Sequence, residues 1–160
     1  MSSLRVLGID PGLRVTGYGA IECTGAKRRL LEAGIVAPDV KATLEQRLHA
    51  LHRGISEVVA ATNPDMVVIE ELFSAYKNPL TAVLMGHARG VLCLAAAEHG
   101  VAVQTLGHSL VKRALTGSGA AKKEQVRSMV IQMLGLTRVP EPADVSDALA
   151  LALAYGNRVL

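Results

Sequence analysis

Four carboxylates in this sequence occur beside apolar segments, where an isolated negative charge is costly to bury. Asp10 ends the segment VLGID, and Glu70 or its neighbour Glu71 ends the segment MVVIEE. Asp144 and Asp147 stand at the start of the apolar stretch ALALALAY. Burying one ionised carboxylate is unfavourable unless a positive group compensates it, and each further carboxylate adds to that cost. These acids therefore need either separate structural explanations or a shared cation.

A structural explanation exists for each acid considered alone. Asp10 precedes Pro-Gly, and aspartate is a common turn residue because its side chain hydrogen-bonds nearby backbone. Asp144 and Asp147 lie at an expected helix start, where the helix dipole favours a negative charge by ~0.3–1 kcal/mol. At the level of single residues, this structural interpretation stays open.

The four acids taken together favour a shared cation. Asp10 and the glutamate each follow a short apolar strand, so their carboxylates converge if the two strands are neighbours. Asp144 and Asp147 are three residues apart and share one face of a helix. Side chains of a strand alternate between faces, so only one of Glu70 and Glu71 can join them, and the pattern does not say which. Oxygen ligands without Cys or His indicate Mg²⁺ or Mn²⁺ rather than zinc.

Two divalent ions held by such carboxylates suit one class of reaction. Ions ~3.5–4 Å apart support in-line displacement at phosphorus, where one activates water and the other stabilises the leaving oxygen. The sequence therefore predicts metal-dependent hydrolysis of a phosphodiester.

The elements that must position these acids follow from hydrophobic spacing and turn signals. Short connections predict an antiparallel meander of three strands at the start of the chain. Thr43 and Gln46 fit a capping box, and Asn63-Pro64 ends the helix that follows. Alternating strands and helices then predict an α/β fold around a mixed sheet. We expect strands at 5–10, 16–22, 30–38, 65–71 and 101–106, helices at 43–63 and 78–99, and helical structure after residue 106.

Composition limits the class of protein. The chain has 160 residues, half of them hydrophobic and 19% charged, so we expect one folded domain over 1–160 rather than a disordered chain. No uninterrupted apolar run approaches the roughly 20 residues that span a bilayer, and Cys23 and Cys93 have no metal-like spacing. We therefore expect a cytoplasmic protein with reduced thiols and no membrane association.

The net charge of +3 weakly favours an anionic partner. Four basic residues crowd one short region, which is either an ordinary solvated surface or a phosphate-binding one: Lys112, Arg113, Lys122 and Lys123. Gly86 and Gly90 would let a second backbone approach the helix over 78–99, in a core contact or a dimer interface. The five histidines have no metal-ligand spacing near the acids, and we assign them no chemistry.

Four motifs resemble those of the RuvC family, the bacterial Holliday-junction resolvases or crossover-junction endodeoxyribonucleases. They are LGIDPGLRVTGYG, IEELF, VKRALTGSGAAKKEQV and ADVSDALALALA, in the order and spacing of that family. The similarity runs from about Leu4 to Tyr155. It implies a ribonuclease H-like α/β fold, with a five-stranded mixed sheet flanked by helices.

The resemblance also implies roles for individual residues. The acids of the family's motifs are Asp10, Glu70, Asp144 and Asp147, expected to bind two Mg²⁺ ions (or Mn²⁺) and to be catalytic; Glu71 then stays outside the site. The motifs place Lys112 and Lys123 on backbone phosphate, although Lys122 lies beside Lys123 and either of the two could make that contact. Phe73, the only phenylalanine, resembles the residue that stacks on a base near the crossover, although a lone phenylalanine usually belongs to a core.

The function implied is resolution of four-way DNA junctions during recombination and repair, by paired, symmetric nicking of two strands of like polarity. Family members are homodimers, and a branch-migration helicase complex is an expected partner. Two alternatives remain at this point. A related ribonuclease H-like nuclease would act on RNA, and a non-catalytic module would only bind; the retention of four acids speaks against the latter.

Overall fold

The computed structural model describes residues 1–72 and 76–160, which form five strands and five helices. The strands are β1 (Ser3–Asp10), β2 (Thr16–Thr24), β3 (Lys27–Val36), β4 (Met66–Glu70) and β5 (Ala102–Leu106). The helices are α1 (Leu44–Thr62), α2 (Pro79–Glu98), α3 (His108–Thr116), α4 (Lys123–Leu134) and α5 (Ala143–Val159). The expected strands and helices are all present, with boundaries that differ by a few residues.

The strands form one mixed sheet in the order β3-β2-β1-β4-β5. β1, β2 and β3 are the predicted antiparallel meander, and β4 joins β1 in parallel, with Ile69 opposite Ile9. β5 continues the parallel half beside β4. The parallel pairing brings the carboxyl ends of β1 and β4 to the same end of the sheet, which is the condition that convergence of Asp10 and Glu70 requires.

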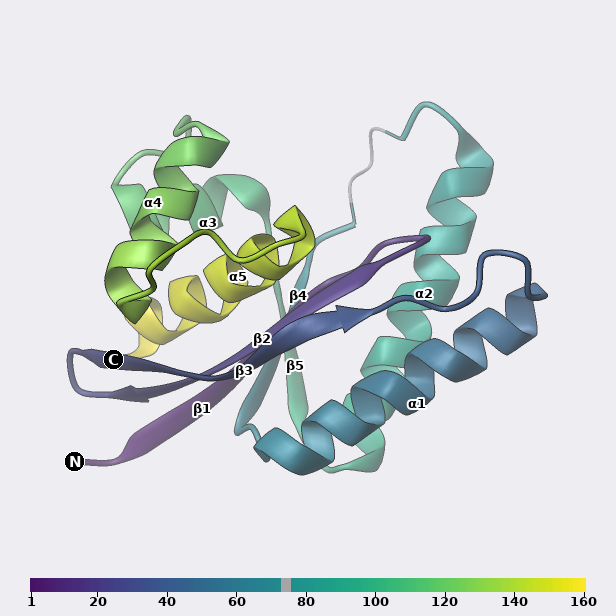
Figure 1. Cartoon of the computed structure of the whole chain (residues 1–160), viewed down its shortest axis with the longest axis horizontal. Helices are drawn as coiled ribbons and strands as arrows, with labels where there is room; N and C mark the ends of the chain where they lie inside the picture. The colour runs from purple at the N-terminus through teal and green to yellow at the C-terminus, as the bar shows by residue number, and fades with distance from the viewer. Residues whose placement is uncertain (73–75) are drawn as a thin grey trace.

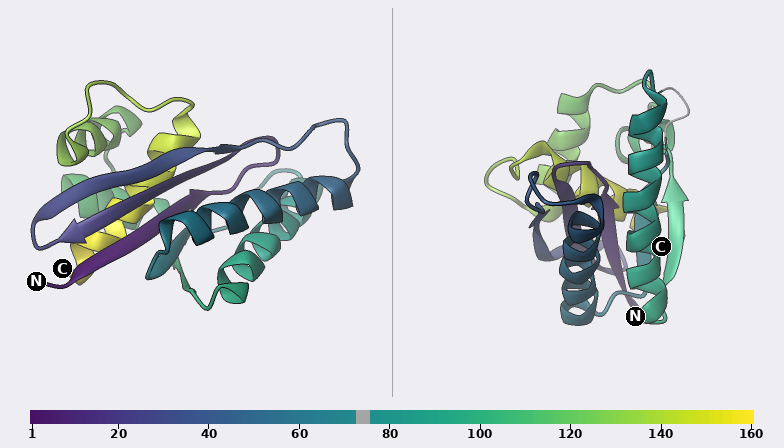
Figure 2. Two further views of the ribbon diagram at one scale, coloured as in Figure 1. Left: turned by 60° about the horizontal axis from the view of Figure 1, so that its bottom comes forward. Right: turned by 90° about the vertical axis from the view of Figure 1, so that its right-hand side faces the viewer.

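Helices cover both faces of this sheet (Figure 1). α1 and α2 lie on one face, where Leu7, Ile9, Val67 and Ile69 pack against them. α3, α4 and α5 lie on the other face, where α5 runs directly across β1 and β2. The two ends of the chain lie close to each other, away from the carboxyl ends of β1 and β4 (Figure 2).

The start of α1 shows how local sequence fixes an element. Thr43 accepts a hydrogen bond from the Gln46 backbone, and the Gln46 side chain accepts one from the Thr43 backbone, at 3.4 and 3.1 Å. These reciprocal bonds satisfy backbone N–H groups that a helix start leaves without partners. At the other end Asn63 adopts a left-handed conformation before Pro64. The predicted capping box and helix end are confirmed.

Glycines in the meander let α5 lie against the sheet. A Cβ at Gly8 would come 2.0 Å from the Ala148 carbonyl oxygen, and one at Gly17 would come 2.2 Å from the Asp144 carbonyl oxygen. Both distances are far below van der Waals contact, so only glycine allows this approach. The glycines that interrupt β1 and β2 therefore bring the first turns of α5 over the end of β1.

α2 buries only part of its apolar surface. The buried residues of α2 are Met85, Ala88, Leu92, Ala95 and Ala96. Only 28% of the 18 residues in its most apolar part are buried. Among the described helices, α2 is the one that is long and apolar enough to cross a membrane. Polar residues such as His87 and Arg89 interrupt its apolar sequence but leave its mean hydropathy high. That criterion is also met by core helices, so the expectation of no membrane association stays a prediction.

Candidate active site

Strand alternation places Asp10 and Glu70 on the face that α5 covers. In β1, Val6 belongs to the core on the α5 side, whereas Leu7 and Ile9 belong to the core on the α1 side. Asp10 follows Val6 by four residues and therefore points to the α5 side. In β4, Val68 packs on the α5 side, and Glu70 follows it by two residues. The same alternation turns Glu71 away.

The electrostatics of Asp10 show that the acids face one another. Burial of Asp10, which is 8% exposed, is the largest of the effects that raise its pKa from 3.8 to about 9. The negative charge of Glu70 and a hydrogen bond with it come next, followed by the charges of Asp147 and Asp144. A carboxyl group surrounded by three others takes a proton when no cation is present to offset the repulsion.

The other acids are more open to solvent than Asp10. The side chain of Glu70 is 21% exposed and that of Asp147 is 30% exposed, whereas Glu71 is fully on the surface beside Gly107. Within residues 1–72 and 76–160, no three carboxylate, imidazole or thiolate groups lie close enough together to hold a metal ion as they stand. Ion binding would therefore have to draw the carboxylates closer together.

A cavity of about 50 Å³ opens beside these acids, between α3, α4 and α5. Glu70 and Asp147 contribute acidic groups to its lining, and Lys112 and Lys123 contribute basic ones. Lys123 Nζ lies 3.7 Å from Asp147 Oδ2. Lys122 does not line this cavity; its backbone N–H donates to Gln125 at the start of α4, and its side chain is exposed.

One residue of this cavity escaped the sequence analysis. His108 Nδ1 lies 3.0 Å from Glu70 Oε1, at the first residue of α3 and one turn before Lys112. No chemistry was assigned to the histidines, whereas the structure places His108 in contact with a predicted site acid. The available signal was its spacing of four residues from Lys112, which places both on one helix face. Phe73, the predicted base-stacking residue, lies outside the described residues.

Comparisons with known proteins identify the family to which this chain is similar. A model of the family described as "Crossover junction endodeoxyribonuclease RuvC" matches residues 6–155. The crossover junction endodeoxyribonuclease RuvC of Rhodopirellula baltica is 49% identical over 152 residues, which cover 95% of this chain and 85% of that protein. The RuvC protein of Alkaliphilus oremlandii is 44% identical over 153 residues, which cover 95% of this chain and 92% of that protein.

A solved structure shows the same fold. Thermus thermophilus RuvC in complex with a Holliday junction substrate has a TM-score of 0.92 and 36% identity, covering 97% of this chain and 94% of that one. The expected ribonuclease H-like architecture, a five-stranded mixed sheet flanked by helices, is confirmed. With a family match over nearly its whole length, this chain belongs to the RuvC family of crossover junction endodeoxyribonucleases.

Proposed function

We propose that this enzyme resolves four-way DNA junctions by nicking two strands of like polarity at symmetric positions. Family membership supports an endonuclease that acts on Holliday junctions in recombination and repair. The observation in this structure that carries the proposal is the environment of Asp10. Asp10 is buried at the end of β1, and the charges of Glu70, Asp147 and Asp144 act on its carboxyl group. Glu70 and Asp147 also line a cavity together with two lysines.

The donor set fits the divalent metal cofactor that the family implies. Asp10, Glu70, Asp144 and Asp147 supply only hard oxygen ligands, which Mg²⁺ and Mn²⁺ prefer. We propose that these four acids are catalytic and hold two Mg²⁺ ions, which Mn²⁺ can replace. Bound ions of this kind activate water and stabilise the leaving oxygen of a phosphodiester. Burial and then the repulsion from the neighbouring acids raise the pKa of Asp10, and such cations would relieve that repulsion.

The basic residues hold the DNA backbone in this proposal. Lys112 and Lys123 line the cavity with the acids, so a phosphate placed there meets both ammonium groups. The Lys123 side chain is 63% exposed, so its ion pair with Asp147 contributes little to stability. Lys123 therefore stays available to a phosphate group. Lys122 lies on the adjacent surface and contacts DNA further from the cut. Phe73 stacks on a base near the crossover.

Paired nicking needs two active sites, and α2 offers a surface for a homodimer. Leu80, Val83 and Leu94 are 60%, 56% and 51% exposed, and the spacing of these positions places them on one side of the helix with Gly90. In the described part of the chain, a Cβ at Gly86 or Gly90 would meet no atom within 4 Å. This open space favours the dimer interface over the core contact, because a partner helix has room to approach.

The remaining partners follow from the substrate. A branch-migration helicase complex delivers the junction to the dimer, because the crossover must be moved to a preferred cutting position. The cytoplasm is the compartment in which such an enzyme meets chromosomal DNA. Both statements rest on family membership.

Nicking of a mobile four-way DNA junction tests the function. Wild type with Mg²⁺ is expected to release two nicked duplexes, and Asp10→Asn is expected to leave the junction intact. Glu57→Gln, which changes an exposed acid on α1, is the matched control and should cut like wild type. An RNA–DNA hybrid of equal length serves as the second substrate. Equal cutting by wild type and Asp10→Asn, or preference for the hybrid, would contradict the proposal.

A further inference from the structure

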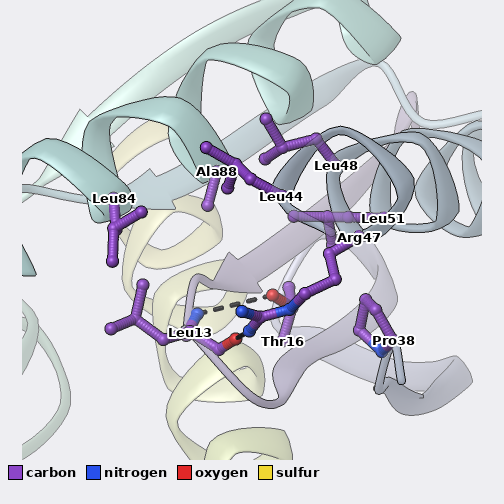
Figure 3. A pocket seen from close by; sticks show the side chains of 10 residues that line it. Leu13, Thr16, Pro38, Leu44, Arg47, Leu48, Leu51, Leu84 and Ala88 are labelled. Atoms are coloured by element: carbon purple, nitrogen blue, oxygen red, sulfur yellow. Dashed lines mark hydrogen bonds between the residues drawn. The ribbon is translucent and has the colours of Figure 1, made fainter. Parts of the chain in front are cut away.

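An arginine from α1 holds the turn that follows Asp10. Arg47 donates from Nη2 to the carbonyl oxygen of Leu13 (Figure 3). Within the same turn, the backbone N–H of Gly12 donates to the Thr16 hydroxyl at 3.4 Å. Arg47 therefore ties α1 to the turn whose first residue is a site acid.

This arginine lies in surroundings that do not favour it. It borders a cavity of about 60 Å³ lined mainly by leucines of α1 and α2, and its Nε is buried with no hydrogen-bond partner in the described part of the chain. A buried donor without a partner costs about 1–3 kcal/mol. A methionine of similar length would fill the space without that cost, so stability alone does not explain Arg47.

A second arginine, from α2, holds the end of β4 in the same way. Arg89 donates from Nη1 to the carbonyl oxygen of Glu70 at 2.8 Å, and from Nη2 to the hydroxyl of Thr105 on β5. The planar guanidinium fits two acceptors at fixed separation. Arg89 thus clamps the carboxyl ends of β4 and β5 at the residue that carries the second site acid.

Both arginines act from behind the site. α1 and α2 cover one face of the sheet, whereas the side chains of Asp10 and Glu70 point to the α5 face. In the described part of the chain, neither guanidinium bonds to a carboxylate. Arg47 bonds to the backbone of Leu13, and Arg89 bonds to the backbone of Glu70 and the hydroxyl of Thr105. We propose that Arg47 and Arg89 are positioning residues that fix the backbone at the ends of β1 and β4, so that the carboxylates of Asp10 and Glu70 can draw together around shared metal ions. This inference rests on the metal site of the proposed function.

Binding of Mn²⁺ to the protein without DNA, followed by electron paramagnetic resonance, tests the inference. Arg47→Met and Arg89→Met keep the aliphatic stem and remove the donors. Each is expected to lower Mn²⁺ affinity by about tenfold or more, the range typical of residues that orient metal ligands. The lysine variants, which keep one charged donor, should recover part of the affinity. Arg53→Met, on the exposed side of α1, is the matched control and should bind like wild type.

Thermal unfolding separates positioning from a general structural role. Arg47→Met is expected to lose Mn²⁺ affinity with little net change in stability, because removal of the buried unpaired Nε offsets the lost hydrogen bond to Leu13. In a Glu70→Gln background, Arg89→Met should lower Mn²⁺ affinity no further, since both changes act through one ligand. Wild-type Mn²⁺ affinity in both methionine variants, or additive losses in the double variant, would overturn the inference. Wild-type affinity in Glu70→Gln itself would instead show that the proposed metal site is wrong, and the inference would fall with it.

Discussion

Replacing Asp10 with asparagine should make the metal-free protein more stable at neutral pH. The pKa of Asp10 is about 9 in the folded protein and near 3.8 when the chain is unfolded. Between these values the folded state holds a proton that the unfolded state releases, so the stability present below pH 3.8 is lost progressively as the pH rises. A catalytic substitution that increases stability is a distinctive signature of acids forced together.

The structure gives the size of this effect. Each pH unit in that interval lowers the free energy of unfolding by about 1.4 kcal/mol. At pH 7, the free energy of unfolding of wild type is therefore about 4 kcal/mol lower than at pH 3.8. Asparagine at position 10 recovers at most that amount, because three carboxylates still face one another. For a chain of this length, about 4 kcal/mol corresponds to a Tm increase of up to roughly 16 °C.

Thermal unfolding of both proteins in a chelator, from pH 4 to pH 8, is the assay. The Tm advantage of Asp10→Asn should be small at pH 4 and grow with pH. Adding Mn²⁺ at one hundred times its Kd should then stabilise wild type by about 2.7 kcal/mol and narrow the gap. A variant that is no more stable than wild type at pH 7, or a gap that does not change with pH, would refute the reasoning.

Three further results are expected. The double variant Lys112→Ala/Lys123→Ala should bind DNA with a shallower slope of log binding constant against log salt concentration. The slope should decrease in size by roughly two, because about one unit is lost per phosphate contact. An unchanged slope in a filter-binding assay would show that neither lysine contacts DNA phosphate. Gly17→Ala should cost about 1–3 kcal/mol and abolish nicking, because its Cβ would collide with the Asp144 backbone. Denaturant unfolding measures the loss of stability, and Glu57→Gln, at an exposed position of α1, is the control for both readouts. Val83→Glu, at an exposed position of α2, should convert the proposed dimer into monomers that nick one strand at a time, whereas Ala60→Glu on α1 should not. Light scattering measures the oligomeric state of both variants.

Much of this protein was determined by local sequence. The capping box at Thr43, the left-handed end at Asn63 and the short turns of the meander depend on residues a few positions apart, so their patterns predicted the elements correctly. The residue types of the proposed site could also be interpreted from the sequence alone. Acids at the ends of apolar strands and at the start of an apolar helix are costly wherever the fold places them, and that cost indicated a cation.

Only the tertiary structure decided which groups meet. Residue types alone did not distinguish Glu70 from Glu71; the strand face that α5 covers shows that Glu70 points toward the other acids. Residue types also did not distinguish Lys122 from Lys123, of which only Lys123 lines the cavity. Arg47 and Arg89 carried no local signal of their contacts, and the spacing of His108 from Lys112 indicated a shared helix face but not the contact with Glu70. Each of the three reaches a residue between 19 and 38 positions away. Such contacts depend on strand order and on how helices cross the sheet. Those are properties of the whole chain, and no short stretch of sequence contains them.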